Sequence, residues 1–212
     1  MTKLKNWVVA NPDLAFAILL SVCVYGYFAM STEFFATHRT GFAIMERFAV
    51  LGLVGLALTL CIIAGEIDLS IGSNAALAAV ITVRFTDSWG APTALLIALV
   101  VSTTIGMIQG YFIAYLRVRA IVLTVGTLML LRGVALFAAE EKTVMLTDFR
   151  VPDFISTKML GYFSPASLLV ILMFILVALF INYTKFGREI YAIGGARKEA
   201  VAAGVSLKRP MI

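Results

Sequence analysis

The sequence predicts an all-α integral membrane protein, and three observations support this fold class. Hydrophobic residues make up 61% of the 212 residues and charged residues only 14%, whereas soluble domains contain about 25% charged residues. The mean hydropathy is +0.99. Several uncharged apolar runs reach 17 residues or more, a length typical of membrane helices and not of the alternating strands of a barrel. We expect one polytopic domain over residues 1–212.

Six apolar stretches are expected to cross the membrane. The first, Leu14–Met30, follows a basic N-terminus and competes with a signal-peptide interpretation. Its length and the absence of a small-residue cleavage motif favour an uncleaved span. A polar loop is expected over Ser31–Arg47. The other spans are Phe48–Ala64, a helix that begins near Ile71, Ala91–Leu116, Ala120–Ala139 and Pro165–Ile181.

The stretch after the second span is unusual because carboxylates and glycines lie between two apolar segments. Only 13 residues, Ile71–Val83, separate it from Arg84, which is too few for a straight helix to cross a bilayer. Two alternatives stay open. Either a simple loop precedes a tilted helix that ends near Trp89, or a broken helix starts below the membrane surface.

We call this stretch, Gly65–Ser73, the interrupted segment. Its candidate functional residues are Gly65, Asp68, Ser70 and Gly72. The functional interpretation is a gating segment on a translocation path, because a carboxylate next to an apolar span is costly to bury without partners. The structural interpretation is that Asp68 or Ser70 caps the helix beginning near Ile71. The two interpretations are compatible.

Arg132 lies well inside the span Ala120–Ala139. It is expected either to pair with an internal carboxylate or carbonyl groups and fix helix packing, or to line a substrate route. Packing is favoured, because a transporter of neutral solutes needs few fixed charges. Cys23 and Cys61 both lie in apolar runs without a CxxC pattern and are expected to pack.

Motifs for catalysis, cofactors and metals are absent from the sequence. It contains no GxxxxGK[ST], HExxH or GxSxG pattern, and its one histidine, His38, lies in the expected polar loop. An enzyme is therefore not expected, and energy for transport must come from a partner or an ion gradient. The net charge of +5 favours membrane lipid over nucleic acid, since no basic stretch is interleaved with aromatics.

The C-terminal tail contains a short expected helix, Ala196–Ala203, which ends at Gly204. Placing the N-terminus and residues 184–212 in the cytoplasm puts most lysines and arginines on that side, as the positive-inside rule requires. A short helix bracketed by glycines there is typical of a docking element. The alternative is an ordinary basic cytoplasmic loop.

Three passages, in order, resemble the permeases of ATP-binding cassette (ABC) importers for monosaccharides, the ribose, xylose, arabinose and autoinducer-sugar type. The first is Gly65–Ser73, which is similar to the pattern Gly-Gly-Ile-Asp-Leu-Ser-Val-Gly-Ser. The second is Thr124–Gly133, similar to Thr-Leu-Gly-Thr followed by Arg-Gly. The third is Thr184–Val205, similar to Phe-Gly-Arg, Tyr-Ala-Ile-Gly-Gly-Asn and Ser-Gly-Ile in series.

The resemblance implies a permease subunit in a bacterial inner membrane that moves a monosaccharide into the cytoplasm. It implies an ABC ATPase subunit, a periplasmic sugar-binding protein and a second, identical or related permease as partners, the binding protein docking outside near Glu140–Ser164. The segment 184–205 would be the coupling segment. Its candidate docking residues are Gly194, Gly195, Glu199, Ala200 and Gly204.

Two residues depart from the family pattern. Glu66 stands where glycine is usual, and Arg197 stands where an Asn-Glu-like pair is common. Family members also have further C-terminal spans, so the chain is expected to be C-terminally truncated. Two alternative functions stay open: an ion-coupled secondary transporter using Asp68 and Glu66, and a truncated, non-transporting membrane remnant.

Overall fold

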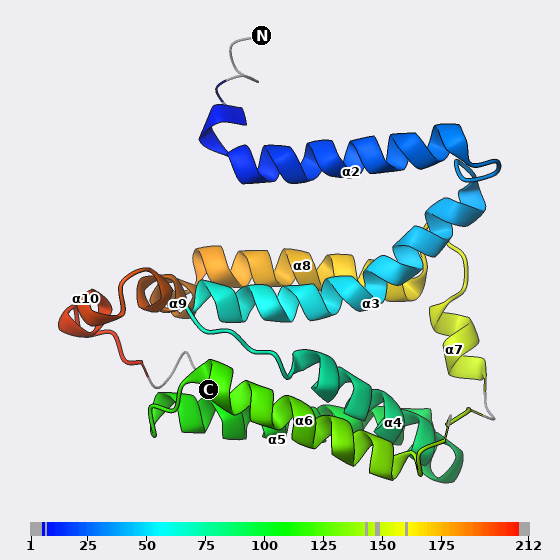
Figure 1. Cartoon of the computed structure of the whole chain (residues 1–212). Coiled ribbons are helices and arrows are strands. Elements are labelled where there is room, and N and C mark those ends of the chain that lie inside the picture. The colour runs from blue at the N-terminus through cyan, green and yellow to red at the C-terminus, as the bar shows by residue number, and fades with distance from the viewer. Residues whose placement is uncertain (1–5, 7, 143, 147–148, 160, 208–212) are drawn as a thin grey trace.

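A computed structural model describes residues 6, 8–142, 144–146, 149–159 and 161–207. Within these ranges the regular structure is helical, and the one β-type feature is an isolated bridge between Met159 and Phe163. Consecutive long helices run in opposite directions, so the N-terminal start of α2 lies at the same end of the molecule as α9 and α10 (Figure 1). The expected all-α polytopic fold is confirmed.

The first two helices are α2, Pro12–Ser31, and α3, His38–Ile63. The expectation of a polar loop over Ser31–Arg47 was wrong for its second half, because α3 already begins at His38. The side chain of Thr37 accepts the Thr40 amide and starts the helix. The charged residues after it therefore lie on the first turns of α3.

Three helices form a tightly packed group: α4, Ile71–Trp89, α5, Ala91–Ala114, and α6, Ala120–Ala138. Gly90 alone separates α4 from α5. A small apolar core holds the three helices together; it contains Leu77, Leu131 and Ala135, with Val80, Ile81, Val101 and Ile105 packed around it. We call α4, α5 and α6 the trio.

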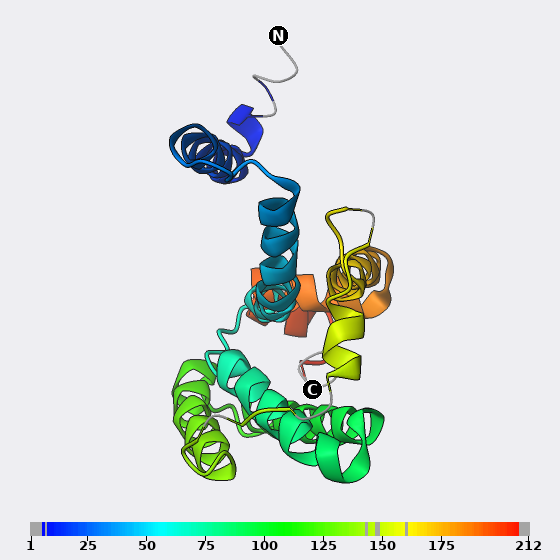
Figure 2. The same cartoon turned by 90° about the vertical axis from the view of Figure 1, so that its right-hand side faces the viewer.

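A second group contains α3, α8, Pro165–Tyr183, and α9, Lys185–Gly195. Two short helices belong to the connections: α7, Arg150–Ile155, precedes α8, and α10, Arg197–Ala202, follows α9. Figure 2 shows the α3–α8 pair lying beside the trio, whereas α2 lies apart from both. The sequence did not predict α9 as a helix of its own.

Five helices are long and apolar enough to cross a membrane: α2, α3, α5, α6 and α8. The sixth long helix, α4, falls outside this set and carries Arg84 and Asp87 near its end. It starts about halfway along the trio and not at its end (Figure 1). The structure therefore favours the broken-helix alternative for the segment after α3.

Candidate functional site

A buried polar cluster occupies the interrupted segment between α3 and α4. Asp68 Oδ1 accepts the backbone amide and the hydroxyl of Ser70, each at 2.7 Å. Ser70 Oγ in turn accepts Nε2 of Gln109 on α5 at 2.8 Å. Ser70 is 1% exposed and Gln109 7% exposed. The cluster supplies the partners that a buried polar side chain next to an apolar span requires.

The expected cap of α4 takes a different form. Ser70 occupies the N-cap position, but its side chain forms no hydrogen bond with an amide of the first helical turn. Its hydroxyl is instead used by Asp68 and Gln109. Ser70 therefore does not cap α4 with its side chain, whereas Asp68 accepts the Ser70 amide at the start of the helix. Asp68 and Ser70 together join the interrupted segment to α5.

Two further hydrogen bonds place this segment deep between the helices. The Thr124 hydroxyl on α6 donates to the Ile67 carbonyl at 3.3 Å. Asn74 Nδ2, one turn into α4, donates to the carbonyl of Ser102, halfway along α5, at 3.3 Å. Because α4 begins opposite the middle of α5, the Gly65–Ser70 stretch crosses about half of the trio as irregular backbone.

The end of α9 packs directly against the end of α3. A Cβ added to Gly194 would lie 1.8 Å from the Ile63 carbonyl oxygen, so only glycine fits there. Gly65 has φ +77°, and a Cβ on it would lie 3.2 Å from Gly194 Cα. The segment 184–205, the expected coupling segment, is thus in backbone contact with the interrupted segment.

The side of α9 and α10 that faces away from α3 is exposed. Gly195 and Glu199 are exposed, and no atom lies within 4 Å of a Cβ built on Gly195. Ala200 is buried at 5% exposure and faces inward. Gly204 follows α10, where the Val205 amide bonds back to the Ala200 carbonyl at 2.9 Å. Of the five candidate docking residues, Gly194 and Ala200 are therefore packed against the rest of the molecule. Gly195, Glu199 and Gly204 are exposed.

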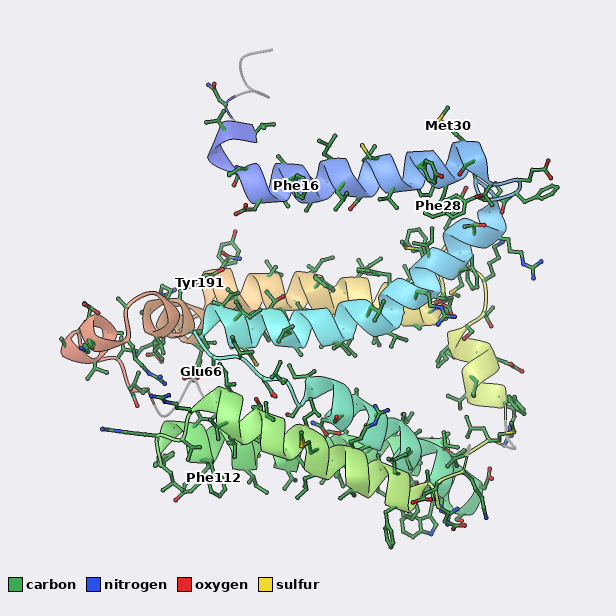
Figure 3. The ribbon with its side chains drawn as sticks, viewed as in Figure 1. Phe16, Phe28, Met30, Glu66, Phe112 and Tyr191 are labelled. Atoms are coloured by element: carbon green, nitrogen blue, oxygen red, sulfur yellow. The ribbon has the colours of Figure 1, made fainter. Side chains whose placement is uncertain are left out.

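Glu66 and Arg197, the two residues expected to depart from the family pattern, form an ion pair. Nη1 of Arg197 lies 2.9 Å from Oε1 of Glu66. The Glu66 side chain is 18% exposed and that of Arg197 47% exposed. Figure 3 shows Glu66 where the end of α3 faces the trio. This contact joins the start of α10 to the interrupted segment.

A cavity of about 1200 Å³ lies beside this ion pair. It is lined by the interrupted segment, the α5–α6 connection, α10 and the residues that follow α10. Its charged lining consists of Glu66 against Arg117, Arg119, Arg197 and Lys198. The cavity is therefore strongly basic and separates α10 from the trio.

Two candidate residues have no described contact that assigns them a role. Arg132 is exposed on α6, and the described part of the chain offers it no ion pair. The expected internal partner is therefore not found there, and its role stays a prediction. Gly72 is exposed, with nothing within 4 Å of an added Cβ.

The sequence analysis did not identify Gln109 and Thr124 as site residues. A polar residue inside an apolar span is the sequence signal that could have identified them.

Metal chemistry finds no support in the described ranges, where no three His, Cys, Asp or Glu side chains gather. What the arrangement offers is mechanical. The exposed region of α9 and α10 is anchored by its backbone to α3 and by an ion pair to the irregular segment that enters the trio.

Several known permease proteins are similar to this chain. The Escherichia coli K12 inner membrane ABC transporter permease protein YjfF is 29% identical over 213 residues, covering 94% of this chain and 62% of its own length. The autoinducer 2 import system permease protein LsrD of E. coli SMS-3-5 is 30% identical, with the same two coverages. LsrC of Salmonella typhi is 27% identical, covering 93% of this chain and 57% of its own length.

The chain thus spans about three-fifths of the length of these relatives. No solved structure matches. Residues 41–212 match the family described as branched-chain amino acid transport system / permease component. That match covers α3 to α10 together with the interrupted segment and the Glu66–Arg197 pair, and the chain belongs to this permease family.

Proposed function

We propose that the chain is the membrane-spanning permease subunit of an ATP-binding cassette importer that moves a monosaccharide or a sugar-like signal into the cytoplasm. The relatives named as autoinducer 2 import permeases support the substrate class. Five helices able to cross a membrane support the permease role. The chain itself performs no bond chemistry in this proposal, since ATP hydrolysis belongs to a separate ATPase subunit.

The proposal depends on one observation. The region of α9 and α10 packs against α3 on one side and is exposed on the other. Gly194 holds the end of α9 against the Ile63 carbonyl with no space for a side chain. Gly195 and Glu199, next to it, face outward and are exposed. An ATPase subunit that docks on these two residues would push on α3 through backbone contact, and backbone contacts transmit displacement with little compliance.

The orientation in the membrane is part of the proposal. We place the N-terminus and residues 184–212 in the cytoplasm, where the ATPase has nucleotide. Arg117, Arg119, Arg197 and Lys198 all gather at that end, as the positive-inside rule favours. The opposite end carries α7 and the connection from Glu140 to Ser164, on which a periplasmic sugar-binding protein would dock.

Transport in this scheme is a shift between two conformations. A second permease subunit, identical or related, would complete the path. Nucleotide binding draws the ATPase subunits together, and the α9–α10 elements convert that movement into rocking of the spans. Both partners bias the same two-state path, one from each side of the membrane.

The test is uptake in proteoliposomes that contain ATP and a complex reconstituted from this permease, an ABC ATPase subunit and a periplasmic sugar-binding protein. Radiolabelled ribose, xylose, arabinose and autoinducer 2 are the substrates. We expect accumulation of one of them to require both ATP and the ATPase subunit. Uptake that continues without the ATPase and follows an ion gradient would favour the ion-coupled rival. Association with the ATPase without any uptake would identify a non-transporting remnant.

A second arm tests the docking residues. Glu199→Arg and Gly195→Trp are expected to abolish co-purification of the ATPase while membrane insertion stays normal. Glu33→Arg is the matched control, because Glu33 is equally exposed but lies at the opposite end of the molecule. If ATPase association survives both changes in the tail, the docking assignment is wrong.

A further inference from the structure

We infer that the Glu66–Arg197 ion pair is the device that ties α10 to the interrupted segment, so that both residues are positioning residues for transport. This inference rests on the proposed function and adds a residue pair to it. The pair joins two segments that are far apart in the sequence, with Nη1 of Arg197 2.9 Å from Oε1 of Glu66.

The environment of Glu66 makes Arg197 its necessary partner. Its side chain is 18% exposed, and Oε1 is buried without an aligned hydrogen bond from any described residue. A buried carboxylate oxygen is stable only when a charge or donor compensates it. The guanidinium of Arg197 supplies that charge. Removing Arg197 therefore takes away the one ion pair that Glu66 forms among the described residues and leaves only the other basic residues of the cavity lining nearby.

A continuous series of contacts leads from this pair to the interior. The Glu66 amide bonds to the Cys61 carbonyl at the end of α3 at 3.0 Å. The next residue, Ile67, accepts the Thr124 hydroxyl of α6. Asp68 then accepts from Ser70, which is held by Gln109 of α5. Movement of α10 that pulls on Glu66 therefore reaches three spans within five residues of chain.

The charges around Glu66 make the pair sensitive to reversal. Arg117, Arg119 and Lys198 line the same cavity, so Glu66 is the one carboxylate in a basic surrounding among the residues that line it. Replacing it with arginine adds a positive charge where four already gather. Reversing Arg197 as well restores one opposite pair, which is why the double reversal is informative.

The experiment measures sugar taken up per ATP hydrolysed, in the same reconstituted complex, for Glu66→Arg, Arg197→Glu and the double variant. Each single reversal is expected to lower this ratio about tenfold while ATP hydrolysis continues, and the double reversal to return it to within about threefold of the wild type. A pair with a purely structural role would lower the amount of transporter in the membrane and leave the ratio unchanged, which would overturn the inference.

The matched control is Lys198→Glu, which makes the same charge change one residue further along α10. Combined with Glu66→Arg it is expected to give no recovery, because the recovery needs the position of Arg197 and not just a negative charge on α10. Equal recovery with Lys198→Glu, or singles that retain the wild-type ratio, would overturn the inference.

Two other outcomes are also decisive. If the single reversals fail to reach the membrane, the milder variant Arg197→Gln decides: a lowered uptake ratio at normal membrane level supports the inference, and a wild-type ratio overturns it. A wild-type complex that takes up no sugar with ATP overturns the proposed function and this inference with it. A wild type that transports normally beside unaffected variants overturns this inference alone.

Discussion

The trio and the α3–α8–α9 group are held together by different kinds of contact. In the trio, apolar side chains such as Leu77 and Leu131 pack into a core. A hydrogen bond from Gln109 to Ser70 also joins α5 to the start of α4. In the α3–α8–α9 group, the backbone of Gly194 meets the Ile63 carbonyl, and Ser164 at the start of α8 donates to Glu46 on α3. Side-chain cores adjust to small changes, whereas backbone contacts do not.

This difference has a mechanical meaning. A displacement of α9 moves α3 directly, because no flexible side chain lies between them. It reaches the trio through the interrupted segment and the Glu66–Arg197 pair, since a cavity lies between α10 and the α5–α6 connection. The comparison therefore predicts that the two groups move relative to each other and that the irregular stretch between them takes up the change.

The most disruptive change should be Gly194→Ala, which tests the rigidity of the α9–α3 contact. The new Cβ would lie 1.8 Å from the Ile63 oxygen, so α9 must shift away, at a cost of about 3 kcal/mol. Unfolding in detergent with added SDS, followed by circular dichroism, measures it. Gly195→Ala has open space around its Cβ and should change stability by no more than about 0.5 kcal/mol. Equal losses would mean that α9 is not fixed to α3.

The next effect should come from Ser70→Ala, which breaks the polar pin of the trio. Asp68 and the buried amide of Gln109 both lose a partner, and the expected cost is about 2 kcal/mol in the same unfolding assay. Adding Gln109→Leu should recover part of the loss by removing one of the unpaired groups. The control is Ser21→Ala on α2, an exposed serine that bonds only to its own helix at Ala17. An unchanged stability for Ser70→Ala would show that the cluster does not hold the trio.

A smaller effect is expected for Ser164→Ala, which sharpens the comparison at the other end of the α3–α8–α9 group. Ser164 is fully buried, forms a capping box with Ser167 and donates to Glu46. Its loss should cost about 1 kcal/mol. Ser156→Ala, at an exposed serine, is the control. A loss no larger than that of the control would mean that the cap contributes nothing to the α3–α8 pairing.

The smallest effect should come from Arg84→Gln, at an ion pair outside the link between the two groups. Arg84 and Glu140 are 49% and 55% exposed, so solvent screens their attraction and the expected change is about 0.5 kcal/mol or less. Arg197→Gln is the comparison, because its partner Glu66 is only 18% exposed. A larger loss from Arg84→Gln than from Arg197→Gln in the unfolding assay would contradict the importance assigned to the inner pair.

The spans could be predicted well because membrane helices need long apolar runs with few charges. The start of α3 was missed because Arg39, Glu46 and Arg47 resemble loop residues, while the cap at Thr37 depends on local geometry. The helix α9 was missed for a similar reason, since its glycines argue against a helix unless a close neighbour requires them. The hydrophobic periodicity of the sequence predicts neither the contact between α3 and α9 nor the core of the trio.

Of the candidate site, Asp68, Ser70 and the glycines of the tail were singled out from the sequence, but their partners were not. Gln109, Thr124 and Arg197 are separated from the interrupted segment by 39 residues or more along the chain, and long-range pairing leaves no local signal. Nothing in the sequence connects Glu66 with Arg197. Only the fold shows that they face each other.

The halfway start of α4 has an electrostatic consequence. A membrane helix usually has both ends at the interfaces, where water screens its macrodipole. The positive end of α4 instead lies inside the trio, next to the Asp68 carboxylate, where a low dielectric extends the reach of the field. Any tilt of α4 therefore redirects that field through the interior, although the charged side chains of α4, Arg84 and Asp87, lie near its other end.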